Sequence, residues 1–284
     1  MRRPTVDGQF YSKDFEELGN QINDCFTSKF GPGDLPVSKR NKKIFGIVAP
    51  HAGYNFSGPC QAWAYKEVAE SKFPETYVIL GNSHNGESGV LLDDYQTPFG
   101  IVKTDRYFCE MLIKNLDFIK DNKFAHKNEH SVEVQLPFLQ YVSKDRLKDI
   151  KIVPLVLGYD IDKIRQLGIF LGDCERRINI IISGDFTHYG PSYGYVPFVY
   201  NVKKELYDLD KTAISFIEKM DVDGFWDYVN EKGATICAAK SIIATMIAAK
   251  GYGVKRARLL QYYTSGDVTG DYNNAVGYGS LVFE

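Results

Sequence analysis

The stretch Ile178-Asn-Ile-Ile-Ile-Ser-Gly-Asp-Phe-Thr-His-Tyr-Gly190 decides the fold class of this chain. It begins with the predominantly apolar residues 178–182 and then changes at once to Gly184, Asp185 and His188. A short apolar run of this kind, followed by turn residues, is typical of a strand that is buried on both faces of a parallel sheet. The polar residues of the stretch therefore belong to the end of a buried strand.

Short apolar runs of the same kind recur on both sides of this stretch, and helical patterns separate them. The other expected strands are residues 44–48, 77–80, 152–157, 257–263 and 276–283, and residues 89–92 and 100–103 form an expected hairpin. The expected helices are residues 12–30 with Ser12 as N-cap, 57–70, 107–116, 131–142 and 161–171, a long helix after residue 200, and one from about 235 to 251. Alternating strands and helices predict a single α/β domain over residues 1–284, with a mainly parallel mixed sheet flanked by helices.

Composition narrows the classes of function. The 284 residues include 34 Lys and Arg against 36 Asp and Glu, which gives a net charge of -2 and no electrostatic indication of a nucleic-acid or membrane partner. No apolar run is long enough to span a membrane, and no apolar segment follows the basic residues near the start. The cysteines are odd in number and scattered, which favours reduced thiols and a cytoplasmic location. They are Cys25, Cys60, Cys109, Cys174 and Cys237.

Three of the five histidines follow expected strands. His51, His84 and His188 each lie a few residues beyond an apolar run, and glycines flank each of them. Ligands in open α/β sheets bind at the carboxyl ends of the strands, and glycine lets the backbone turn sharply there. We therefore expect these histidines to face one common site.

An anionic ligand beside two imidazoles would complete a metal site with open positions. Cys237 is the best thiolate candidate, because it lies at the start of an expected helix with Thr235 as a candidate N-cap. A helix N-terminus would lower the pKa of its thiol. The other four cysteines are interpreted as structural residues.

Asp185 and His188 are three residues apart in one turn, which suits an acid–base pair or an orienting contact. The same residues allow a metal-free alternative with Cys237 as nucleophile, His188 as base and Asp185 as the residue that orients it. That alternative ranks lower because it leaves His51 and His84 without a role.

Glu129-His-Ser-Val-Glu133 opens an expected helix, so the two carboxylates would share one helix face. They either cap the helix or, together with His130, support the pocket. His126 is expected on the surface. The aromatic-rich residues 189–200 either form the wall of a groove or pack as a loop, and residues 265–271 form a turn or a pocket wall.

Several motifs, taken together and in order, resemble the Memo family over nearly the whole chain. These motifs are Pro4-Thr-Val-Asp-Gly-Gln-Phe-Tyr11, Ala49-Pro-His-Ala-Gly-Tyr54, Leu80-Gly-Asn-Ser-His84, Glu129-His-Ser-Val-Glu-Val-Gln-Leu-Pro137, Ser183-Gly-Asp-Phe-Thr-His188 and Thr235-Ile-Cys237. The resemblance implies an α/β fold similar to class III extradiol dioxygenases. It also implies a metal pocket of two His and one Cys, with iron or copper as the metal.

Carried over residue by residue, the implied metal ligands are His51, His84 and Cys237, and the Cys replaces the carboxylate of the related dioxygenases. Family members usually have Gly after this Cys, whereas here Ala238 adds a methyl group to the pocket. Some eukaryotic members are described as phosphopeptide-binding signalling adaptors, and others as redox-active metal proteins.

The first hypothesis is therefore a metal-binding redox protein, similar to a non-haem dioxygenase, with Fe(II) favoured and copper or zinc compatible. Asp185 and His188 would move protons, while Tyr54, Glu129 and His130 would lie on the substrate side. The second hypothesis is a non-enzymatic peptide or phosphopeptide adaptor that uses the same pocket, and the third is the metal-free hydrolase. The expected ligand is a small molecule or a peptide, with no nucleic acid or membrane partner, and a homodimer is compatible with the sequence.

Overall fold

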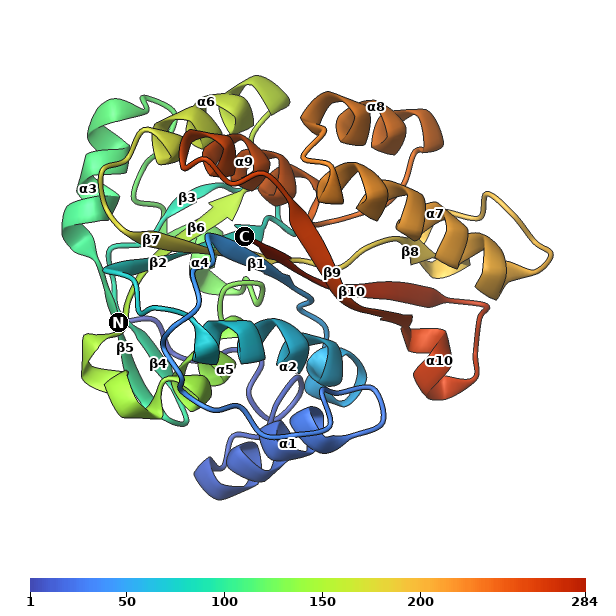
Figure 1. Cartoon of the computed structure of the whole chain (residues 1–284), viewed down its shortest axis with the longest axis horizontal. Coiled ribbons are helices and arrows are strands. Elements are labelled where there is room, and N and C mark those ends of the chain that lie inside the picture. The colour runs from blue at the N-terminus through green and yellow to red at the C-terminus, as the bar shows by residue number, and fades with distance from the viewer.

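A ten-stranded mixed sheet runs through the centre of the protein (Figure 1). The computed structural model describes residues 1–284. The path of the sheet is β4-β5-β6-β2-β7-β1-β10-β8, with β3 paired to β6 and β9 paired to β10. The strands are β1 Gly46–Ala49, β2 Thr76–Asn82, β3 Gly89–Val90, β4 Tyr95–Thr97, β5 Gly100–Thr104, β6 Lys151–Leu157, β7 Ile178–Ser183, β8 His188–Tyr189, β9 Ala257–Thr264 and β10 Ala275–Phe283.

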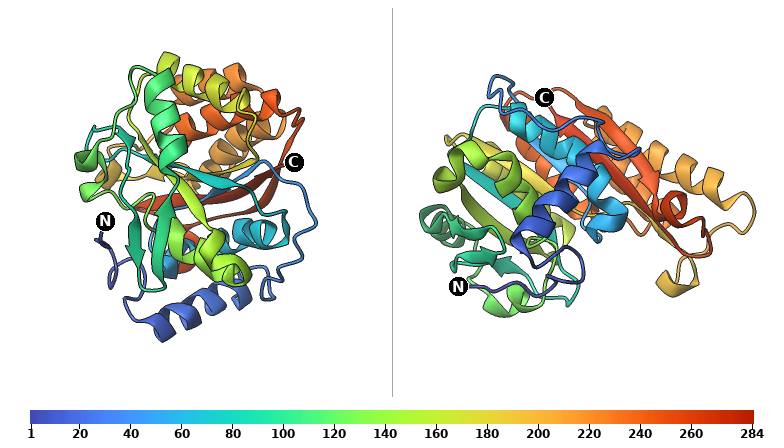
Figure 2. Two further views of the ribbon diagram at one scale, coloured as in Figure 1. Left: turned by 90° about the vertical axis from the view of Figure 1, so that its left-hand side faces the viewer. Right: turned by 90° about the horizontal axis from the view of Figure 1, so that it is seen from below.

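Helices cover both faces of this sheet (Figure 2). They are α1 Phe15–Thr27, α2 Tyr54–Glu70, α3 Arg106–Asn115, α4 Lys123–Lys127, α5 Gln135–Val142, α6 Ile161–Gly172, α7 Val202–Glu218, α8 Val222–Lys232, α9 Ala239–Gly251 and α10 Ser265–Thr269, with 3₁₀ helices η1 Lys144–Asp149 and η2 Pro191–Tyr193. No helix of the structure combines the length and the apolar character needed to cross a membrane.

The two faces of the sheet bury separate apolar cores. Successive side chains of a strand point to opposite faces, so Val78 and Leu80 of β2 pack into the core with α3, α6 and α9. Tyr77 and Ile79 of the same strand pack into the core with α1, α2 and α5. A strand buried on both sides is apolar at nearly every position, and this is why the continuous runs in the sequence predicted the central strands correctly.

The four central strands β6, β2, β7 and β1 are parallel, whereas β10 pairs antiparallel with both β1 and β9. The mainly parallel mixed α/β sheet predicted from the sequence is therefore confirmed. In the register, Ile182 lies opposite both Val48 of β1 and Leu80 of β2. The carboxyl ends of three strands consequently lie level with one another at one edge.

Several local predictions are wrong. The hairpin is formed by β4 and β5, whereas the expected first strand, β3, pairs with β6. The N-cap of α1 is Asp14, whose carboxylate accepts the backbone N–H groups of Glu16 and Glu17, and not Ser12. Helices α5 and α9 begin four residues later than expected, and residues 265–269, expected as a turn, form the short helix α10.

Candidate metal centre

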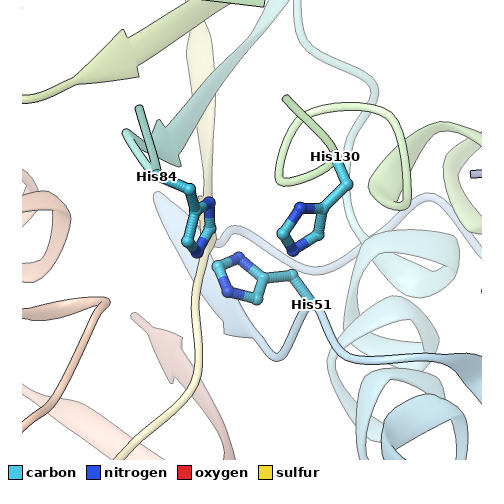
Figure 3. Close-up of side chains that lie close together, drawn as sticks. All are labelled: His51, His84 and His130. Atoms are coloured by element: carbon cyan, nitrogen blue, oxygen red, sulfur yellow. The ribbon is translucent and has the colours of Figure 1, made fainter. Parts of the chain in front are cut away.

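Three histidines meet at the carboxyl edge of the central strands (Figure 3). His51 follows β1, His84 follows β2, and His130 lies in the segment before α5. Each histidine offers one ring nitrogen, and these three atoms lie within 4.8 Å of one another. Such a group of convergent nitrogens could hold a metal ion. The structure therefore brings His51 and His84 together, and it adds His130, which the sequence placed on the substrate side.

The rings of this cluster are packed closely and are partly enclosed. The ring centroids are 5.3 Å apart for His51 and His84, 5.0 Å for His51 and His130, and 4.6 Å for His84 and His130. Burial, reinforced by the neighbouring imidazoles, lowers the pKa of His51 well below its usual value. Burial and the charge of His84 lower the pKa of His130 to about 4. Both rings are therefore neutral near pH 7, which is the form that binds metals.

Glu129 fixes the orientation of His84. The Nδ1 of His84 lies 3.0 Å from each carboxylate oxygen of Glu129, and the backbone N–H of His84 donates to Oε2 at 3.0 Å. Burial lowers the pKa of His84, but Glu129 outweighs this effect and leaves that pKa raised. Burial opposes ionisation of Glu129, yet its bonds to His84 and to the Ser131 backbone N–H lower its pKa to about 2. A carboxylate on Nδ1 leaves Nε2 available to a metal.

Cys237 lies beside this cluster. Its Sγ is 3.4 Å from Nε2 of His51 and accepts the backbone N–H of Asp185 at 3.0 Å. The expected lowering of its pKa is wrong, because burial and the charge of Asp185 raise the pKa of the thiol well above its usual value. The residue also precedes α9, which begins at Ala239. That Cys237 ligates a metal stays a prediction.

Asp185 and His188 flank His51. One carboxylate oxygen of Asp185 accepts the backbone N–H of His51 at 2.9 Å, and the other lies 3.9 Å from Nε2 of His51 and 4.0 Å from Nε2 of His188. Nδ1 of His188 is 3.1 Å from the carbonyl oxygen of Phe186, so this nitrogen carries the proton. Burial raises the pKa of Asp185, and the charge of His188 opposes that rise. Their catalytic roles stay predictions.

Tyr54, expected on the substrate side, and His126, expected on the surface, both lie in packed surroundings. Tyr54 is 1% exposed, and its hydroxyl donates to the carbonyl of Val134 at 2.6 Å, a placement that gives no support to substrate contact. His126 is not on the surface: it is fully buried, with Nδ1 2.7 Å from the hydroxyl of Tyr95 and Nε2 2.9 Å from the carbonyl of Gly89. The surface prediction for His126 was wrong because an isolated polar residue in a sequence does not indicate that its side chain is buried.

Glu129 and Glu133 do not share a helix face, because α5 begins only at Gln135. Glu133 is fully buried, and it forms an ion pair with Arg2 and accepts the backbone N–H of Thr5 and the hydroxyl of Tyr11. These partners hold its carboxylate in place outside any helix. The N-terminal segment therefore supports the chain directly after His130.

Gln135 and Ser183 are supporting residues that the sequence analysis missed. The Nε2 of Gln135 donates to the carbonyl of Pro50 at 3.0 Å and to the hydroxyl of Ser183 at 2.8 Å. The same hydroxyl lies 3.5 Å from Nδ1 of His51. Gln135 thereby joins α5 to the loop that carries His51. Only its place within the motif of residues 129–137 could have drawn attention to it.

A cleft of about 430 Å³ opens beside Cys237. Half of its lining is hydrophobic, which is typical of sites for small organic ligands. The lining residues are Asn82, Ser83, Gly86, Leu157, Gly158, Trp226, Val229, Asn230, Gly233, Ala234, Ile236, Cys237, Ala239 and Lys240. The cleft gives a ligand access to the cysteine side of the candidate centre.

The sequence matches the model of the Memo-like protein family over residues 2–282. The chain belongs to the Memo-like family. A MEMO1 family protein of Methanopyrus kandleri is 39% identical and matches 99% of this chain and 98% of its own length. MEMO1 family proteins of Nitrosopumilus maritimus and Methanocaldococcus jannaschii are 35% and 37% identical, with each match covering 100% of this chain and 99% of the relative.

The Memo-like fold also resembles a solved structure. An uncharacterized protein from Escherichia coli K12 superposes with a TM-score of 0.56 at 13% sequence identity, over 85% of this chain and 100% of the other. At that identity the likeness concerns the fold alone. The family resemblance inferred from the sequence motifs is confirmed by the family match over nearly the whole chain.

Proposed function

We propose that this Memo-like protein is a metal-dependent redox protein, similar to a non-haem dioxygenase, that acts on a small molecule bound in the cleft beside Cys237. The observation that carries the proposal is the convergence of three ring nitrogens, from His51, His84 and His130, within 4.8 Å. Cys237, 3.4 Å from Nε2 of His51, is proposed as a further ligand. Three imidazoles and a thiolate form a donor set that suits iron, copper and zinc.

The surroundings of the cluster fit a metal ion. His51 and His130 are neutral near pH 7, and Glu129 orients His84 in the way that carboxylates orient metal-bound histidines. Bound Fe(II), or copper in its place, would supply electron-transfer chemistry that amino-acid side chains lack.

The protein's own residues would bind the substrate and handle protons. The hydrophobic half of the cleft lining would contact an organic substrate and exclude water from that side. Oδ2 of Asp185 lies 4.0 Å from Nε2 of His188, so a proton released near Cys237 can be held at either atom. Buried Asp185, whose pKa is raised, is the proposed proton acceptor, and His188 would stabilise its charged form.

The geometry does not favour the metal-free hydrolase. That mechanism requires His188 as the base of Cys237, whereas the imidazole in contact with Sγ is that of His51. Burial also raises the pKa of the thiol, and without a metal to displace its proton the nucleophilic thiolate is disfavoured. The adaptor hypothesis gains no specific contact in this cleft.

Metal content tests the proposal. The protein would be incubated anaerobically with Fe(II), desalted and analysed by plasma mass spectrometry, together with His51→Ala, His84→Ala, His130→Ala and Cys237→Ser. Cys174→Ser, which changes a partly exposed thiol after α6, is the matched control. Near-stoichiometric iron in the wild type and the control, and its loss in the histidine variants, is the expected result. A wild type that takes up neither iron, copper nor zinc would overturn the proposal.

A further inference from the structure

A basic hollow lies at the opposite edge of the sheet from the histidines. It occupies about 730 Å³ where β2, β6 and β7 begin. Its lining consists of Arg40, Lys72, Phe73, Pro74, Glu75, Arg146, Lys148, Asp149, Lys151, Arg176 and Arg177. The amino ends of these parallel strands meet there, so the fold gathers cations that are far apart in the sequence.

The charge of this basic hollow is strongly positive. Seven of its eleven lining residues are basic and two are acidic, although the whole chain carries a net charge of -2. All four arginines are paired: Arg176 and Arg177 with Glu75, Arg146 with Asp149, and Arg40 with Asp145, while Asp105 also contacts Arg176. The three lysines of the lining are the cations without a partner. Lys148 and Lys151 make no ion pair, and one terminal nitrogen of Arg176 is buried without a hydrogen-bond partner. Unpaired cations around one hollow favour a ligand with several negative charges.

A second, apolar hollow of about 440 Å³ adjoins the first, and the two share Lys72, Phe73, Pro74 and Arg177. The rings of Phe45 and Tyr252 line it with their centroids 4.7 Å apart. The hydroxyl of Tyr252 donates to the carbonyl oxygens of Cys174 and Arg176, which fixes the ring beside the basic segment. A flat ring could therefore lie beside the cations.

We propose that the two hollows together bind a nucleotide. Its phosphates contact the basic hollow, and its base lies against Phe45 and Tyr252. Both volumes are in the range of small-ligand sites. A single charged hollow beside a ring-sized one fits one nucleotide better than a nucleic-acid strand, which follows an extended basic groove.

Calorimetric titration of the full chain tests this site. The probes are ADP, GDP, inorganic pyrophosphate, adenosine and a single-stranded 12-nucleotide DNA, all at one fixed ionic strength. We expect one of the two nucleotides to bind at least about fivefold more tightly than pyrophosphate, adenosine or the DNA. Binding weaker than about 1 mM for both nucleotides, or equal binding of nucleotide and pyrophosphate, would overturn the proposal. Tighter binding of the DNA would also overturn it.

Variants separate the two halves of the site. The double variant Lys148→Gln with Lys151→Gln, at two exposed positions, should weaken the binding of nucleotide and of pyrophosphate alike. The control variant Lys13→Gln with Lys114→Gln removes two exposed cations outside the hollows and should change neither affinity. Val254→Trp, which fills the apolar hollow, should weaken the binding of the nucleotide and leave the binding of pyrophosphate unchanged. If the control variant of Lys13 and Lys114 lost as much affinity as the variant of Lys148 and Lys151, the attraction would be non-specific and the proposal would be overturned.

Discussion

At the scale of single residues, Glu129 determines how His84 meets the proposed metal. Its carboxylate holds Nδ1 of His84 and accepts the backbone N–H groups of His84 and Ser131. Neutralising the carboxylate keeps its shape but removes the charge that stabilises a metal-bound imidazole. The conservative substitution Glu129→Gln therefore isolates the electrostatic contribution.

We predict that Glu129→Gln weakens metal affinity about 10- to 100-fold, because partners of metal-bound histidines commonly contribute that much. A competition titration of Zn(II) against a chelating dye measures the effect without redox chemistry. Glu87→Gln, in the loop after His84 and bonded to the side chain of Asn122, is the matched control and should bind metal as the wild type does. Equal affinities for all three proteins would contradict a role for Glu129.

Asp210 is a buried carboxyl group that lies outside the metal centre. It accepts hydrogen bonds from the Thr187 hydroxyl and from the Tyr262 hydroxyl, the latter at 2.6 Å. Burial raises its pKa to about 6, although those hydrogen bonds oppose the rise. Between about pH 4 and pH 6 the folded protein keeps a proton that the unfolded chain releases. The stability that comes from this group is therefore lost as pH rises through that interval.

We predict that Asp210→Asn removes this loss. Two pKa units correspond to about 3 kcal/mol, so the free energy of unfolding of the variant should fall less between pH 4 and pH 6 than that of the wild type, by up to about 3 kcal/mol. Urea denaturation at a series of pH values measures both profiles. Other titrating groups are common to the two proteins and cancel in the difference. Parallel profiles would contradict the assignment.

At the scale of elements, the sequence predicted most accurately the strands and strand ends, which depend on residues close together in the chain. The central strands were found because burial on both faces makes them apolar throughout, and His51 and His84 were found because they follow such strands. His130 follows no strand, so the sequence placed it on the substrate side of the pocket and not among the metal ligands. The starts of α5 and α9 were misplaced because side chains there bind distant partners, as Glu133 binds Tyr11 and Thr235 binds the carbonyl of His188.

The N-terminal segment provides a prediction at this scale. Residues 2–11 are held to the chain after His130 through buried Glu133, which accepts several donors including Arg2. Glu133→Gln should lower the free energy of unfolding by about 3–5 kcal/mol, because it leaves the buried charge of Arg2 without its partner. Tyr11→Phe removes one donor and should cost about 1–2 kcal/mol. Denaturation curves measure the free energy of unfolding of both variants. A loss below about 3 kcal/mol for Glu133→Gln would contradict this account.

At the scale of the whole molecule, the sheet separates two chemically different edges. Its carboxyl edge gathers the histidines of the candidate metal centre, and its amino edge gathers the cations of the basic hollow. Both gatherings follow from parallel strands, which bring residues from distant parts of the chain to the same edge. Because the two edges share no lining residue, ligands bound at one should stabilise the fold independently of changes at the other.

Zn(II), which is redox-inert, tests this independence. A metal bound by His51, His84 and His130 joins the ends of β1 and β2 to the segment before α5, so it binds the folded state and should raise the free energy of unfolding. The gain is about 2.7 kcal/mol when free Zn(II) is 100 times its dissociation constant. We predict the full gain in the variant with Lys148→Gln and Lys151→Gln, and none in His84→Ala. Loss of the gain in the lysine variant would show that the two edges are linked, contrary to the separation seen in the structure.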